Sequence, residues 1–145
     1  MNTEIVITHS PEETIELGER VSKTLKKGDF IALSGDLGAG KTMFVKGLAK
    51  GLGVRDYMYV NSPSFVIIKE YNGDKDLYHF DVYRLEEKSF SETVDYRRYF
   101  YDEGITVVEW AEKIKDLLPE EYLGVKIEHI AEKERRFEFE RVKVF

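Results

Sequence analysis

An eight-residue glycine-rich segment, residues 35–42, constrains the fold of this chain of 145 residues more than any other feature. It matches the phosphate-loop pattern G-x-x-x-x-G-K-[ST] at every position. An apolar run, 30–33, precedes the segment, and apolar residues at helical spacing follow it. A strand, a glycine loop and a helix in this order predict an α/β protein. The eight residues are Gly35, Asp36, Leu37, Gly38, Ala39, Gly40, Lys41 and Thr42.

Each residue type in this loop suits the binding of nucleotide phosphates. Glycines let successive backbone N–H groups approach phosphate oxygens without side-chain collision. The helix that starts at the loop directs its positive end at the anion. Lys41 supplies a cation for the β- and γ-phosphates, and Thr42 supplies a hydroxyl for Mg²⁺. We therefore expect all eight residues to bind a nucleotide, with Lys41 also catalytic and Thr42 a metal ligand.

Composition removes several other classes of protein. The chain is 42% apolar and 34% charged, which is typical of a globular protein. It has no membrane-spanning run, no signal-peptide pattern and no cysteine, so we expect a cytoplasmic protein. The net charge of −6 argues against a protein that grips nucleic acid alone. No repeat or linker divides the chain, which predicts a single domain over residues 1–145.

Coarse patterns predict the elements around the loop. A first helix is expected from Pro11, capped by Ser10, to Lys27, where Gly28 follows. Further helices are expected over 90–101 and 110–118. The C-terminal segments 125–130 and 137–145 are predicted to form a hairpin. Because the apolar residues of its second strand change from odd to even positions, we expect a bulge or bend near Arg141.

A phosphate loop needs further groups to hold Mg²⁺ and to orient an attacking water. Asp81 follows the apolar run 77–80, and Glu109 follows 105–108. In open α/β sheets, ligands bind at the carboxyl ends of the strands, so an acid at a strand end faces that crevice. We therefore expect each acid to be a candidate for holding Mg²⁺ or orienting the water. The alternative is that each is a solvated acid at the start of a loop.

The other candidate residues are less specific. His79 is interpreted as a structural residue of a strand. Trp110 packs in the core or stands beside the nucleotide, and Ser64 senses the γ-phosphate or belongs to a plain turn. Three arginines are phosphate clamps or ordinary surface charges: Arg84, Arg97 and Arg98.

The sequence constrains the base of the nucleotide through an absence. It has no N-K-x-D, T-K-x-D or D-x-x-G motif of the kind that guanine-specific GTPases carry, so ATP is favoured by elimination. Two further classes of protein remain open: a small metabolite kinase and a nucleotide-gated binding module. A kinase needs an acceptor pocket and an arginine-bearing lid, and a chain of this length leaves little room for both.

Four motifs in order resemble the TsaE family, the P-loop ATPase subunit of bacterial tRNA threonylcarbamoyladenosine synthesis. They are GDLGAGKT at 35–42, SPSF at 62–65, HFDVYRL at 79–85 and VVEW at 107–110, and LGERV at 17–21 also fits. The resemblance covers residues 10–118. The family usually has Thr at the position of Ser64, and the stretch 92–100 lacks the glycine that the family usually carries there.

The resemblance implies a P-loop NTPase-like α/β fold, a three-layer sandwich with a mostly parallel central sheet and added antiparallel strands. It implies a weak, Mg²⁺-dependent ATPase, using ATP and ADP, that is stimulated by the partner subunits TsaD and TsaB. TsaD carries the transfer onto tRNA, so tRNA is met only through the complex. The implied roles are phosphate and Mg²⁺ binding by Lys41 and Thr42 and a position near the nucleotide for Trp110. Asp81 and Glu109 are implied to be the catalytic carboxylates, with Glu109 as the Mg²⁺ contact.

Overall fold

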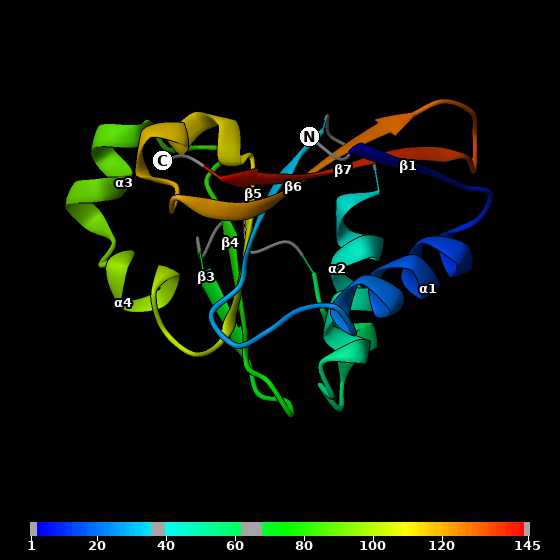
Figure 1. The fold of residues 1–145 in the computed structure, drawn as a ribbon, viewed down its shortest axis with the longest axis horizontal. Helices are drawn as coiled ribbons and strands as arrows, with labels where there is room; N and C mark the ends of the chain where they lie inside the picture. Colours follow the sequence, from blue (N-terminus) through cyan, green and yellow to red (C-terminus); the bar gives the residue numbers. More distant parts are fainter. Residues whose placement is uncertain (1–2, 36–39, 62–67, 144–145) are drawn as a thin grey trace.

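The computed structural model describes residues 3–35, 40–61 and 68–143. Seven strands in this part of the chain form one sheet in the order β1-β7-β6-β2-β5-β4-β3 (Figure 1). The strands are β1 (Thr3–Thr8), β2 (Phe30–Ser34), β3 (Ile68–Tyr71), β4 (Leu77–Asp81), β5 (Ile105–Glu109), β6 (Glu121–His129) and β7 (Arg135–Lys143). The helices are α1 (Pro11–Ser22), α2 (Lys41–Gly51), α3 (Glu87–Thr93) and α4 (Arg97–Phe100), with 3₁₀ turns η1 (Tyr57–Tyr59) and η2 (Ala111–Leu117).

The centre of the sheet is parallel and its flanks contain antiparallel pairs. Strand β2 pairs in parallel with β5 and β6, and β5 pairs in parallel with β4. Strands β3 and β7 are antiparallel to their neighbours. Helices α1 and α2 cover one face, while α3, α4 and η2 lie on the other (Figure 1). The predicted three-layer α/β fold is confirmed.

Glycines allow α1 to cross closely over α2. A Cβ atom on Gly47 would lie 2.1 Å from the carbonyl oxygen of Ile15, and one on Gly18 would lie 2.3 Å from that of Phe44. Both distances are far below van der Waals contact, so the two backbones approach in a way that no larger residue permits. This crossing fixes the position of α2, the helix that follows the phosphate loop.

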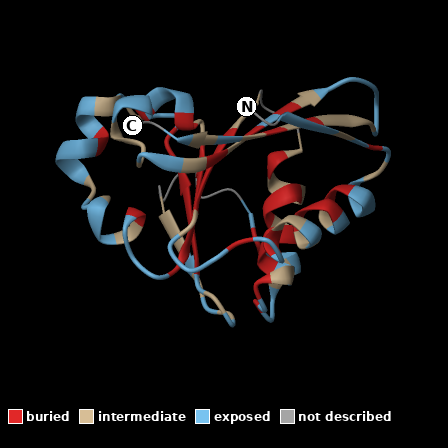
Figure 2. Cartoon of the chain, in the orientation of Figure 1, coloured by how far each residue is buried: buried red, intermediate tan, exposed pale blue. Residues whose placement is uncertain are grey.

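Two apolar clusters fill the space between the sheet and its helices (Figure 2). The cluster under α1 and α2 is mainly aliphatic and includes Leu33, Leu48 and Val107. The cluster on the opposite face is mainly aromatic and includes Phe80 and Phe100. The central strands β2, β4 and β5 are buried on both faces, as expected for parallel strands covered by helices on each side.

The N-terminal helix begins as predicted and ends early. Ser10 Oγ accepts a hydrogen bond from the N–H of Glu13 at 3.1 Å, which confirms the cap. The helix ends at Ser22 rather than Lys27. A Cβ on Gly51 would lie 1.7 Å from Ser22 Oγ, so the helix ends where it meets the last turn of α2.

Three other expectations are corrected. The helix expected over 90–101 is two short helices, α3 and α4, separated at Val94, which has extended backbone angles. The segment after Trp110 is the 3₁₀ turn η2 rather than an α-helix. The bend near Arg141 is absent, since β6 and β7 pair without interruption from Glu121–Lys143 to His129–Arg135. The apolar residues change phase because Phe137 and Phe139 face α2, whereas Val142 lies beside Tyr122 and Leu118 on the other face.

In the described ranges, no helix has the length and apolar character needed to span a bilayer.

Candidate functional site

Strand β2 leads directly into the phosphate loop, and α2 leads out of it. Gly35 has φ 145° and Gly40 has φ 98°, so both described ends of the loop use backbone conformations that favour glycine. Asp36, Leu37, Gly38 and Ala39 lie outside the described residues. Gly40 is the N-cap residue and has no side chain to cap the helix, and the first turn of α2 contains no acidic residue. Among the described residues, the positive end of the helix therefore has neither a side-chain cap nor a neighbouring acid, which suits an anion.

Lys41 connects the two ends of the loop. Its side chain is buried, with the residue only 6% exposed, and its Nζ donates a hydrogen bond to the carbonyl oxygen of Gly35 at 2.6 Å. The same ammonium lies 3.7 Å from the centre of the Trp110 ring, in the geometry of a cation–π contact. The predicted phosphate-binding cation is thus held at the loop, beside the aromatic ring that the sequence also singled out.

Both predicted carboxylates lie at strand ends next to the loop. Asp81 ends β4 and pairs in register with Glu109, which ends β5 and pairs in turn with Leu33 of β2. Both acids are buried, with exposures of 5% and 2%. Alternation along the strands puts them on the same face as Leu77 and Val107, which pack under α1 and α2. The acids therefore face the side of the sheet on which α2 begins.

The two carboxylates have different partners. Glu109 Oε2 forms a buried hydrogen bond with His79 Nε2. His79 Nδ1 is also buried, and it has no partner within the described part of the chain. Asp81 Oδ1 accepts a hydrogen bond from the N–H of Tyr83 at 2.9 Å, so the turn after β4 orients it. The structural interpretation of His79 therefore missed its contact with a candidate metal-binding side chain.

Trp110 has an unusual backbone conformation. With φ 63° and ψ 36° it is the only non-glycine residue in the described ranges with positive φ. Its N–H donates to the carbonyl oxygen of Leu33 at 3.0 Å, which extends the pairing of β5 with β2 by one residue. Its ring packs against that of Tyr83 at 4.7 Å between centres. Strained backbone of this kind clusters at functional sites, and here it directs the chain past Lys41.

The remaining predicted residues are placed as follows. Thr42 is the second residue of α2 and is partly buried, while Ser64 lies outside the described residues. Arg97 and Arg98 belong to α4 and stack on neighbouring tyrosines on the face of the sheet opposite α2, so the structure does not bring them to the loop. Arg84 lies in the turn after β4, at the same edge of the sheet as Asp81.

The described side chains do not form a ready-made metal cage, because no group of three or more His, Cys, Asp or Glu residues among them has a metal-binding arrangement. A single carboxylate with a hydroxyl nevertheless suits Mg²⁺, because this ion is usually held by one or two carboxylates together with substrate phosphates and water. Thr42 and Glu109 are the residues expected to supply protein ligands.

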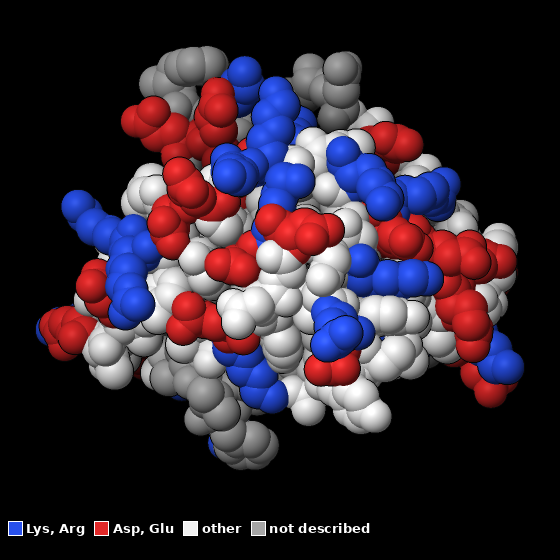
Figure 3. Space-filling model, turned by 90° about the horizontal axis from the view of Figure 1, so that it is seen from below, with Lys and Arg blue, Asp and Glu red and all other residues white. Residues whose placement is uncertain are grey.

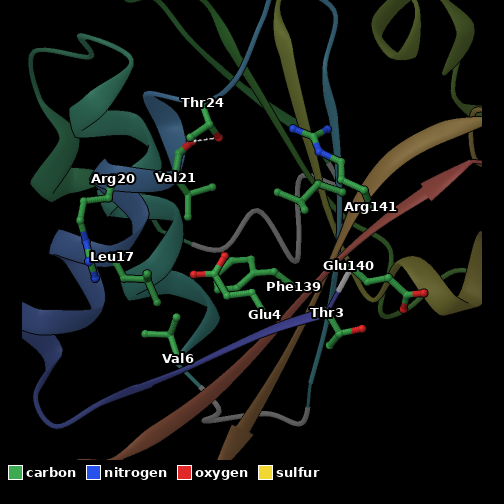
Figure 4. A pocket seen from close by; sticks show the side chains of 11 residues that line it. Thr3, Glu4, Val6, Leu17, Arg20, Val21, Thr24, Phe139, Glu140 and Arg141 are labelled. Carbon is green, nitrogen blue, oxygen red and sulfur yellow. Dashed lines mark hydrogen bonds between the residues drawn. The ribbon is translucent and has the colours of Figure 1, made fainter. Parts of the chain in front are cut away.

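Two hollows help to delimit the site. One of about 480 Å³ adjoins the start of the loop; it is lined by Ser34, Gly35, Glu112 and residues 126–129. Another of about 470 Å³ lies between α1 and strands β1, β6 and β7 (Figure 4). Leu17, Val21 and Phe139 supply apolar surface there, and its lining contains no residue of the phosphate loop or of the carboxylate pair. The first hollow, and not the second, adjoins the candidate site.

Comparison with known proteins gives the same family as the four motifs. The sequence model of the family "Threonylcarbamoyl adenosine biosynthesis protein TsaE" matches residues 8–137. A TsaE protein of Bacillus subtilis is 46% identical over 136 residues, covering 93% of this chain and 84% of the relative. One from Treponema pallidum is 36% identical, covering 89% of this chain and 94% of the relative.

A solved structure agrees with these relatives. The crystal structure of Bacillus subtilis YdiB superimposes with a TM-score of 0.79 at 38% sequence identity, covering 98% of this chain and 86% of that one. Both the sequence match and the fold therefore extend over nearly the whole chain. The chain belongs to the TsaE family of threonylcarbamoyl adenosine biosynthesis proteins.

Proposed function

We propose that this chain is a weak, Mg²⁺-dependent ATPase that serves threonylcarbamoyladenosine modification of tRNA together with TsaD and TsaB. The observation that carries the proposal is the meeting of three features at one edge of the sheet. They are the open N-terminus of α2, the buried ammonium of Lys41, and the buried carboxylates of Asp81 and Glu109. Phosphate binding needs the first two, and hydrolysis needs acids beside them.

Lys41 and the first turn of α2 hold the phosphates of ATP in this proposal. Thr42 and Glu109 hold Mg²⁺, which when bound neutralises charge on the β- and γ-phosphate oxygens. In this proposal Asp81, which accepts a hydrogen bond from the N–H of Tyr83, orients the attacking water. Trp110 excludes solvent from one side of the Lys41 ammonium, which strengthens the attraction between that cation and a phosphate.

A need for partner subunits fits the charge of the molecule. The net charge is −6, and on the face shown in Figure 3 basic side chains alternate with acidic ones rather than forming a continuous basic surface. Tight binding of tRNA relies on clustered Lys and Arg. We therefore propose that tRNA is met only through the complex, in the cytoplasm.

The test is Mg²⁺-dependent ATP hydrolysis by the purified chain, alone and with TsaD plus TsaB. We expect slow turnover alone and faster turnover with the partners. Lys41→Ala and Glu109→Ala should each lower turnover about 100-fold or more, and Glu109→Ala should still bind nucleotide. The matched control is Glu103→Ala, an exposed acid near the opposite end of β5.

Other outcomes separate the remaining classes of protein. Turnover at the wild-type rate in both site variants would remove the site assignment. ADP release that depends on a small-molecule acceptor would identify a kinase instead. Nucleotide binding without turnover, even with both partners, would identify a nucleotide-gated binding module. Tight, salt-dependent binding of tRNA by the chain alone would contradict the role given to the partners.

A further inference from the structure

The β6–β7 hairpin contacts the start of α2 through two side chains of β7. The ring of Phe137 packs against that of Phe44 at 5.3 Å between centres. Two residues earlier on the same face of β7, the side chain of Arg135 covers Gly40, one turn before Phe44 on the helix. A Cβ atom on Gly40 would lie 3.4 Å from both Cγ and Nε of this arginine. The hairpin therefore touches the phosphate loop at the last glycine before Lys41.

The nitrogen atoms of the Arg135 guanidinium group have two different environments. Its Nη1 donates to three carbonyl oxygens of the hairpin turn, those of Ala131, Glu132 and Glu134, at 3.1, 3.3 and 3.0 Å. Its Nε is buried and has no hydrogen-bond partner in the described part of the chain. One end of the group thus fixes the turn, while the other leaves a donor next to Gly40.

A buried donor without an acceptor is destabilising, and such groups in native proteins call for an explanation. This one belongs to a cation and lies against Gly40, the residue before Lys41, whose ammonium attracts an anion. A phosphate group at the loop would bring both an opposite charge and acceptor oxygens to this end of the molecule.

We propose that Arg135 is a positioning residue for the phosphate end of the nucleotide. Its stem holds Gly40 in place against the anchored hairpin, and its Nε–H is satisfied when a phosphate occupies the loop. The inference rests on the proposed function and extends it by naming a residue, outside the loop and the carboxylate pair, that sets phosphate affinity. Because Arg135 acts on the phosphates, its effect should be the same for a nucleotide and for pyrophosphate.

The chain offers a local probe and a matched control. Trp110 is its single tryptophan and lies beside Lys41, so its fluorescence reports on the site. Arg136 is the next residue on β7 and points to the opposite face, where it approaches Glu128 and Glu138 at 3.7 and 3.9 Å. Arg136→Ala thus removes a cation from the same strand without touching the loop.

The experiment titrates Trp110 fluorescence with MgADP and separately with pyrophosphate, in the wild type and in Arg135→Met, Arg135→Lys and Arg136→Ala. We expect Arg135→Met to weaken both ligands by about tenfold or more and by the same factor. Arg135→Lys, which keeps the charge, should restore part of that loss, and Arg136→Ala should stay within about twofold of wild type. Melting temperatures without ligand identify any change that is purely structural.

Three results would overturn the proposal. The first is affinity within twofold of wild type in Arg135→Met. The second is a loss confined to MgADP with pyrophosphate unaffected, which would place the effect at the nucleoside. The third is a lower melting temperature with unchanged affinity, which would leave Arg135 as a clasp of the hairpin alone. Failure of the wild type to bind either ligand would instead remove the proposed function itself.

Discussion

The two faces of the sheet are packed in different ways. Under α1 and α2 the core is mainly aliphatic, and the two helices meet at glycines where their backbones nearly touch. Under α3, α4 and η2 the core is mainly aromatic, and the helices are short. The first face carries the phosphate loop and both carboxylates. The difference indicates that the site is built where backbone geometry is most tightly fixed, while rings fill the less regular side.

The largest effect is expected on the aromatic face. Phe100 is buried, and its ring lies within 6.2 Å, centre to centre, of four others: those of Phe30, Phe80, Phe90 and Tyr96. Phe100→Ala should lower the free energy of unfolding by about 4 kcal/mol, because it leaves a cavity among rigid rings. Chemical denaturation measures this loss. The control is Tyr101→Ala, at a neighbour that is 63% exposed; equal effects of the two changes would show that this face is not a packed core.

The glycine crossing should give the next largest effect. Gly47→Ala should cost about 3 kcal/mol, because its Cβ would force α1 and α2 apart. The sign is informative, since alanine in an exposed helix would instead add up to about 1 kcal/mol. Gly124→Ala on β6 is the control, because its nearest contact would be an ordinary 3.5 Å. A stabilised Gly47→Ala protein would contradict the close crossing.

A smaller effect is expected at the polar pair on the aliphatic face. His79→Leu should lower the free energy of unfolding by about 2 kcal/mol, because the buried carboxyl of Glu109 loses its partner. Replacing both residues by leucine should recover most of that loss, since an apolar pair leaves no buried polar group without a partner. Thermal or urea unfolding of the single and double variants checks this. A double variant no more stable than His79→Leu would show that the pair is not an isolated unit.

The smallest effect should lie at the rim of the aromatic face, and it should depend on pH. The hydroxyl of Tyr78 donates to Asp102 Oδ2 at 2.7 Å. This bond lowers the pKa of Asp102 and raises the pKa of Tyr78. Because the pKa of Asp102 is lowered in the folded state, its contribution to stability is present above the unfolded value of about 4 and is lost as pH falls through the folded value.

Tyr78→Phe should therefore be slightly less stable than wild type near neutral pH, and the difference should shrink under acid conditions. It should shrink again above about pH 10, because the raised pKa of Tyr78 means that the folded state resists its ionisation. Unfolding free energies of the wild type and Tyr78→Phe, measured across the pH range, should show both decreases of the difference, one in acid and one in alkali. A difference that stays constant from acid to alkaline pH would show that the hydrogen bond does not affect the ionisation of either Asp102 or Tyr78.

The contrast between the faces also explains what the sequence could predict. Helix α2 and the cap at Ser10 follow local rules, and both were predicted correctly. The break at Val94 follows from packing instead. Phe90 and Tyr96 would lie about 120° apart around one continuous helix and about 9 Å apart along it, yet their rings are 5.7 Å apart between centres. Only a chain that breaks between them brings both rings onto Phe100, and no local pattern shows this.

The site divides in the same way. Motif and strand-end position were enough to predict that Lys41, Asp81 and Glu109 lie together at one edge of the sheet. His79 looked like an ordinary strand residue, since its partner Glu109 is thirty residues away. Arg135 could not be selected from the sequence, because it is one of several charged residues in its stretch. Its contact with Gly40 depends on the tertiary fold.

Trp110 occupies a backbone conformation that glycine would adopt at least cost, although it has the largest side chain in the chain. Holding a bulky residue there costs about 1–3 kcal/mol. Selection for folding alone would tend to replace it, so the tryptophan at this position marks a compromise between thermal robustness and activity. Variant libraries screened only for heat resistance should drift away from tryptophan here and, in doing so, uncover the ammonium of Lys41.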